Sequence, residues 1–102
     1  MRICLIGLAG LLLVSSAHAQ SFNCRYARTP DEISICENPR LSALDERMSS
    51  RFFRLRDRLY GPDRARLERD QAAWLNTRLR CGGDPGCIAV VYRARIAELS
   101  GW

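Results

Sequence analysis

The sequence contains no lysine and a single histidine, so all sixteen basic residues among its 102 are arginines. The one histidine, His18, lies in a leader segment that we expect to be removed. Imidazole and amine side chains supply most neutral-pH general bases and Schiff-base nucleophiles in enzymes. Their absence excludes serine–histidine triads, Schiff-base chemistry and histidine-ligated metal sites. We therefore expect a protein that is not an enzyme and that carries no cofactor or metal.

No apolar run is long enough to span a bilayer. The longest, Ile3 to Val14, has 12 residues, follows the basic residue Arg2 and precedes a small-x-small site that ends at Ala19. This arrangement is typical of a secretory signal peptide, 1–19. We expect cleavage near Ala19, export to the periplasm or the medium, and one mature domain, 20–102, without a stable membrane anchor. That domain would carry fifteen arginines against eleven acidic residues, a net charge of +4.

Cleavage would also remove Cys4 and leave four cysteines: Cys24, Cys36, Cys81 and Cys87. An even number of cysteines in a small exported chain predicts disulfides. We favour the pairs Cys24–Cys36 and Cys81–Cys87, because each closes a short local loop. The cysteines form no C-x-x-C motif, so a zinc site is the less favoured alternative.

Capping signals divide the mature chain into helices, and no segment alternates as a strand does. Thr29-Pro30-Asp31-Glu32 is a capping box with proline at the first helical position, which predicts a short helix to about Glu37. Asn38-Pro39 opens a second helix, Tyr60-Gly61-Pro62-Asp63 separates it from a third, and Asp84-Pro85 opens a fourth. The apolar residues expected to face the core are Leu41, Leu44, Met48, Phe52, Leu55, Leu59, Leu67, Trp74, Leu75, Leu79, Ile88, Val91, Tyr92, Ile96 and Leu99. The predicted fold is a small, all-α, disulfide-stapled bundle of about four helices.

A few polar residues fall on or beside these apolar faces. At about 100° per residue, Gln71 and Arg78 lie within the apolar arc of the third helix, Arg95 lies on the packed face of the fourth, and Asp45 borders that of the second. A buried guanidinium requires a carboxylate or several carbonyl acceptors, and Asp45 and Glu32 are the expected partners. Two interpretations stay open: a structural ion-pair network that fixes helix register, or an arginine-lined pocket that holds a carboxylate.

Four arginines follow one another along the second helix at steps of four, three and four residues: Arg47, Arg51, Arg54 and Arg58. We call this row the arginine stripe. It is either a solvated flank of the helix or a contact surface for an acidic partner or an anionic envelope polymer. Nucleic-acid binding is not expected, because the protein is exported and no aromatic residues interleave with the arginines.

The segment Cys81–Cys87, if it is bridged, forms a tight turn between the third and fourth helices. We call it the glycine turn, since it contains Gly82, Gly83 and Gly86. A rigid loop of this kind loses little entropy on binding, as in many protein inhibitors. Gly82, Gly83 and Asp84 are therefore candidate partner-binding residues. The alternatives are a simple stapled turn and, for Asp84, a helix cap.

Taken together, these residues resemble the N-terminal domain of the LprI-type lysozyme inhibitors across essentially the whole mature chain. The resemblance is carried by Phe22-Asn23-Cys24, Thr29-Pro30-x-Glu32-x-x-Ile35-Cys36, Leu41-x-x-Leu44-Asp45, Gln71-x-x-Trp74-Leu75-x-x-Arg78-x-x-Cys81, and Cys87 with Tyr92-x-x-Arg95-Ile96-x-x-Leu99. It implies a helical, disulfide-stapled envelope domain whose activity is inhibition of lysozyme.

Two functions therefore lead. The first is a periplasmic or secreted protein that blocks a peptidoglycan-cleaving lysozyme or binds another envelope protein. The second is a non-inhibitory envelope module that holds anionic glycan or a partner through the arginine stripe. A small carboxylate-pair glycosidase is disfavoured, because a mature chain of 83 residues offers little cleft for a sugar chain. The oligomeric state is left open.

Overall fold

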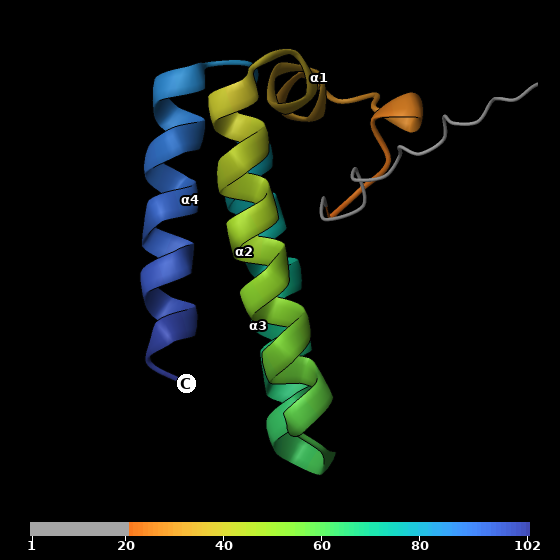
Figure 1. Ribbon diagram of the computed structural model, residues 1–102, viewed down its shortest axis with the longest axis vertical. Helices are drawn as coiled ribbons and strands as arrows, with labels where there is room; N and C mark the ends of the chain where they lie inside the picture. Colours follow the sequence, from red (N-terminus) through yellow and green to blue (C-terminus); the bar gives the residue numbers. More distant parts are fainter. Residues whose placement is uncertain (1–20) are drawn as a thin grey trace, which may run out of the picture.

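Four α-helices and one short 3₁₀ turn make up most of the chain in the computed structural model, which describes residues 21–102 (Figure 1). The 3₁₀ turn η2 spans Cys24–Tyr26, and the helices are α1 (Pro30–Glu37), α2 (Pro39–Arg58), α3 (Gly61–Leu79) and α4 (Pro85–Ser100). These residues contain no strand. The all-α prediction is therefore confirmed, whereas the expected leader, 1–19, with Cys4, His18 and its cleavage site, lies outside the described residues.

The helices begin at the residues that the capping signals predict. Glu32 accepts hydrogen bonds from the backbone N–H groups of Arg28 (3.0 Å) and Thr29 (3.4 Å), which completes the capping box of α1. Asn38 Oδ1 accepts from the N–H groups of Arg40 and Leu41 and caps α2. All four helices carry proline in their first two positions, where a missing N–H costs nothing.

The three long helices run alternately in opposite directions, and the short α1 crosses one end of them. In Figure 1, α2 and α3 form a long hairpin, α4 lies alongside, and α1 is seen nearly end-on at the top. The α3–α4 connection lies at this same end. Because α4 has 16 residues and α2 has 20, the turn between α2 and α3 extends beyond the C-terminus of α4.

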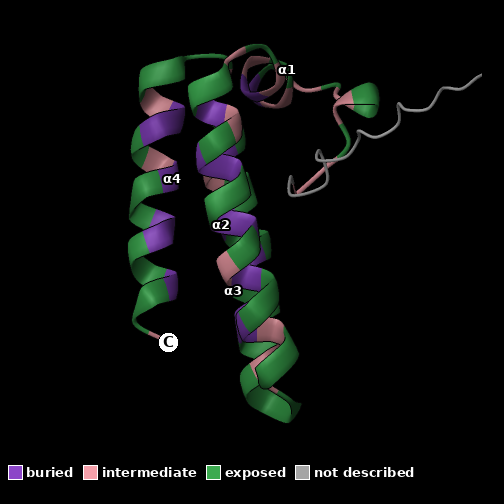
Figure 2. Cartoon of the chain, in the orientation of Figure 1, coloured by how far each residue is buried: buried purple, intermediate pink, exposed green. Residues whose placement is uncertain are grey.

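The core lies where these helices face one another (Figure 2). Its apolar members are Ile35, Leu41, Leu44, Met48, Phe52, Leu55, Leu67, Trp74, Ile88, Ala89, Tyr92, Ile96 and Leu99. The prediction that Leu75 and Leu79 of α3 face the core is wrong, since both side chains are exposed. The buried face of α3 consists instead of Leu67, Gln71, Trp74 and Arg78. These residues are spaced four, three and four apart, so one helical face is filled equally by apolar and polar side chains.

Two disulfides have the predicted pairing. Cys24–Cys36 joins the segment before α1 to the end of that helix, with Cα atoms 5.8 Å apart. Cys81–Cys87 closes the glycine turn, with Cα atoms 5.6 Å apart. Both separations lie in the usual range for disulfides. Small domains bury too little apolar surface for ample stability and commonly depend on such cross-links.

Replacing both Cys24 and Cys36 with serine should lower the free energy of unfolding by roughly 3 kcal/mol, because the unfolded chain regains the freedom of a loop of about 13 residues. The Cys81–Cys87 disulfide closes a shorter loop, so the matched variant with serine at both of these positions should lose somewhat less free energy of unfolding. Urea denaturation of the three proteins measures both effects. A larger loss for the Cys81/Cys87 variant would contradict this ordering.

Candidate functional site

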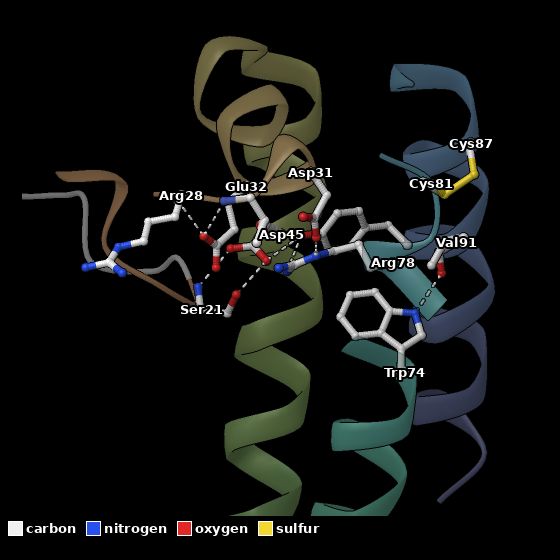
Figure 3. A network of polar contacts seen from close by, with 12 residues as sticks. Ser21, Arg28, Asp31, Glu32, Asp45, Trp74, Arg78, Cys81, Cys87 and Val91 are labelled. Carbon is white, nitrogen blue, oxygen red and sulfur yellow. Dashed lines mark hydrogen bonds and ion pairs between the residues drawn. A yellow bond between two sulfur atoms is a disulfide. The ribbon is translucent and has the colours of Figure 1, made fainter. Parts of the chain in front are cut away.

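A buried polar network joins all four helices through one residue from each (Figure 3). Arg78 of α3 donates from Nε to Asp31 Oδ2 of α1 at 2.8 Å and from Nη1 to the Tyr92 hydroxyl of α4 at 3.2 Å. The Tyr92 hydroxyl in turn donates to Asp45 Oδ1 of α2 at 2.7 Å. All four residues are buried, with Asp45 and Tyr92 fully inaccessible to solvent. We call this set the four-helix network.

The chain before α1 covers this network from the outside. Ser21 donates to Asp45 from both its backbone N–H and its hydroxyl, each at 2.8 Å. The aromatic ring of Phe22 lies 5.3 Å from the guanidinium carbon of Arg78, and Trp74 flanks the same group at 5.7 Å. Asp45 thus accepts three hydrogen bonds, and two aromatic rings shield the buried cation.

The charges in the network are held by their neighbours. Burial would by itself raise the pKa of Asp31, but hydrogen bonds from Thr29 and Arg78, with the Arg78 charge, lower that pKa below its usual value. Burial, with the charge of Asp45, raises the pKa of the Tyr92 phenol far above its usual value. Tyr92 therefore stays protonated and able to donate to Asp45, while Asp31 stays ionised opposite Arg78.

A second set of polar contacts surrounds Arg95. Its Nε donates to Gln71 Oε1 at 3.0 Å and its Nη1 to Glu98 at 3.1 Å. The amide nitrogen of Gln71 lies 3.3 Å from the sulfur of Met48. Gln71 and Arg95 are buried, as the helical periodicity predicts.

The predicted acidic partners of the buried arginines need correction. Glu32 is not a partner of either arginine, because its carboxylate is engaged by the capping box of α1. Asp45 is linked to Arg78 only through the Tyr92 hydroxyl. The direct partner of Arg78 is Asp31, which was not among the predicted site residues. A signal for it exists, since Asp31 lies four residues before the buried Ile35 and so shares its helix face.

The glycine turn is exposed at its tip but rests on α1. The carbonyl oxygen of Gly83 accepts a hydrogen bond from the Ser34 hydroxyl at 3.0 Å. A Cβ atom added to Gly83 would lie 3.6 Å from the carbonyl oxygen of Pro30. Gly82 has φ +60°, a left-handed conformation that favours glycine. Asp84 Oδ1 accepts from the Gly86 N–H at 3.0 Å, so its carboxylate caps α4.

The arginine stripe lies on the outside of α2 and forms no ion pair with an acidic residue of the range 21–102. Arg51 donates to the Ser100 hydroxyl of α4, and Arg54 donates to the Ser50 hydroxyl at 3.0 Å. The ion pairs among residues 21–102 join other residues, and none includes a member of the stripe. These positive charges are therefore not neutralised by the part of the chain that the structure describes.

A cavity of about 400 Å³ opens beside the four-helix network. Exposed apolar side chains, Phe53, Leu75 and Leu79, lie at its edge, and Asp31, Glu32 and Arg78 also line it. The pocket predicted for a carboxylate would require an available guanidinium. Here Arg78 is engaged by Asp31 and Tyr92, and two carboxylates line the same cavity. Its charge is thus unsuited to an anionic ligand.

Within residues 21–102, no group of three or more histidine, cysteine, aspartate or glutamate side chains is arranged to hold a metal ion. No helix in this range is long and apolar enough to cross a membrane. The two disulfides indicate an oxidising, exported location. Comparisons of the chain with protein-family models, curated proteins and solved structures found no match.

Replacing Arg78 with alanine should lower the free energy of unfolding by roughly 3–5 kcal/mol, because Asp31 would then be buried without its counter-charge. The exposed Arg80, two residues later, provides a matched control, and Arg80→Ala should change stability by no more than about 0.5 kcal/mol. Denaturant unfolding compares the two. Equal stability of both variants would show that Arg78 is not a structural residue.

Acid should weaken the fold through Asp31. Because the pKa of Asp31 is lower in the folded than in the unfolded protein, its contribution is complete above the unfolded value and is lost as the pH falls below about 4. The Asp31→Asn variant should be less stable at pH 7 and should lose less stability between pH 5 and pH 2. Thermal unfolding across this pH range measures how stability changes with pH in the unmodified protein and in the variant. An equal loss of stability in both would contradict the role of Asp31.

Proposed function

We propose that this protein is a periplasmic or secreted inhibitor that blocks a peptidoglycan-cleaving lysozyme by direct contact, with the glycine turn as the contact surface. The resemblance to the LprI-type lysozyme inhibitors supports the activity. The residues that carry this resemblance include Asp45, Arg78 and Tyr92 of the four-helix network. These three residues are buried and cannot contact a partner. The contact must therefore be made by an exposed feature, and the glycine turn is one.

The observation that carries the proposal is that the turn presents exposed backbone on a rigid support. Gly83, Asp84, Pro85 and Gly86 are exposed, while the Cys81–Cys87 disulfide and the Ser34–Gly83 hydrogen bond hold the turn in place. A partner can approach such backbone closely, since no large side chain intervenes. Because the turn is already ordered, little conformational entropy is lost on binding.

Electrostatics restrict how such an inhibitor works. The expected mature chain has a net charge of +4, and animal lysozymes are strongly basic, so long-range attraction is not available to bring the two together. Affinity must come from short-range contacts. At physiological ionic strength the repulsion is screened beyond about 8 Å. Inhibition should therefore persist, or improve, as salt is raised from low concentration.

The direct test is a lysozyme activity assay with the purified, oxidised protein and a variant that blocks the turn. Pro85 is the best position, because it is exposed, whereas a side chain at Gly83 would be directed at Pro30. Pro85→Trp should reduce inhibition at least tenfold, since a bulky ring prevents close approach of the backbone. The circular-dichroism spectrum should stay helical.

Pro62→Trp is the matched control, because Pro62 is also an exposed proline at the start of a helix. It lies at the opposite end of the bundle and should leave inhibition unchanged. Full inhibition by folded Pro85→Trp would exclude the turn as the contact surface. Absence of inhibition by the unmodified protein, across lysozymes of several types, would reject the activity itself.

A further inference from the structure

The arginine stripe has no part in the proposed inhibition, and three of its four members line a depression. This hollow, of about 200 Å³, lies between α2 and the end of α4 and is lined by Arg51, Arg54, Leu55, Arg58, Leu99, Ser100 and Trp102. Three guanidinium groups therefore surround one concave surface that also contains an aromatic ring. We call it the C-terminal depression.

The arginines of the depression take part in none of the ion pairs found in residues 21–102. A fourth guanidinium, that of Arg66 on α3, stacks on Trp102, 4.3 Å from the centre of the ring. Cationic groups from α2 and α3 thus gather around the C-terminus of α4.

The guanidinium groups are partly ordered but retain most of their hydrogen-bonding capacity. Arg51 uses one donor on Ser100, and Arg54 uses one on Ser50. Arginine has five N–H donors, and the remaining ones are available to a ligand. The contacts with the two serines reduce the entropy that these long side chains would lose on binding.

The number of arginines that line the depression points to phosphate. One bidentate arginine already satisfies a carboxylate, whereas a phosphate group has more oxygens and accepts from several guanidiniums at once. We propose that the C-terminal depression binds phosphate groups, as found in phosphodiester polymers and phospholipid headgroups. Arg51, Arg54 and Arg58 would be the ligands.

The rest of the stripe extends this site along α2. At 1.5 Å per residue, its members follow one another at axial intervals of about 6, 4.5 and 6 Å. A second hollow next to the first is lined by Arg47, Arg51 and Arg54, with Ser50 and the carboxylate residue Glu46. Regularly spaced cations of this kind favour a ligand with repeated phosphates over a single ion.

This site is independent of the proposed lysozyme contact. Ser100 and Trp102 are at the C-terminal end of α4, while the glycine turn precedes its N-terminal end. Loss of phosphate binding and loss of inhibition are therefore separately measurable.

Binding is measured through Trp102, since the only other tryptophan, Trp74, is buried in the core. The probes are short-chain polyphosphate and vesicles of phosphatidylglycerol, with poly-glutamate of matched charge and phosphatidylcholine vesicles for comparison. Polyphosphate should bind at least tenfold more tightly than poly-glutamate. Tight binding to polyphosphate alone assigns a soluble polymer as the ligand, and added binding to phosphatidylglycerol assigns a lipid headgroup.

The decisive comparison uses two triple variants of equal charge. Replacing Arg51, Arg54 and Arg58 with glutamine should weaken polyphosphate binding more than tenfold, because three charge-assisted contacts are lost. Replacing the exposed Arg25, Arg80 and Arg93 with glutamine removes the same charge elsewhere and should weaken it less than threefold. Trp102 fluorescence reports only binding near the depression. Both titrations are therefore repeated by calorimetry, which also detects binding elsewhere on the protein. Equal losses for the two variants, or equal affinity for poly-glutamate, would overturn the proposal.

Discussion

The arrangement of the helices depends on one buried cation. Arg78 has left water, so its charge must be met by groups within the protein. Asp31 meets it directly, and the Tyr92 hydroxyl both accepts from it and donates to Asp45. Each helix contributes one member to this chain of contacts, so a shift of any helix along its axis would break at least one of them. Apolar contacts alone tolerate such shifts more easily.

The network and the disulfides together make one end of the molecule rigid. The Cys24–Cys36 disulfide ties the chain before α1 to that helix, and this chain places Ser21 against Asp45 and Phe22 against Arg78. The Cys81–Cys87 disulfide closes the turn that follows α3. The arginine stripe begins near the middle of α2 and runs toward the other end, where Arg51 contacts Ser100 in the last turn of α4. Each end thus has a distinct surface: exposed backbone on the glycine turn, and unpaired cations around Trp102.

The local features of the fold were predictable from the sequence. Caps such as Thr29 with Glu32 and Asn38 mark helix starts, and short loops identify the disulfide pairs, because both depend on neighbouring residues. The burial of Arg78 and Arg95 followed from helical periodicity. The acidic partner of Arg78 could not be predicted in this way, since Asp31 is 47 positions away in sequence. Asp31 also lies in the first turn of α1, where acidic residues are common because they stabilise the helix N-terminus.

Two further details depended on tertiary packing. The predicted apolar face of α3 included too many residues. Leu75 and Leu79 lie near core residues on the helix, but their side chains are exposed and line the cavity. The contact of the Ser34 hydroxyl with Gly83, which holds the glycine turn against α1, was not predicted. Neither contact leaves a periodic trace in the sequence.

The central claim, that the Asp31–Arg78 contact fixes the fold, is tested most directly by a double-mutant cycle with Asp31→Asn and Arg78→Met. The free energies of unfolding of the four proteins give the coupling between the two side chains. We predict that the double variant is more stable than the sum of the single losses implies, by about 2 kcal/mol or more. Losses that add to within about 0.5 kcal/mol would contradict the claim, because they would show that the two charges act independently.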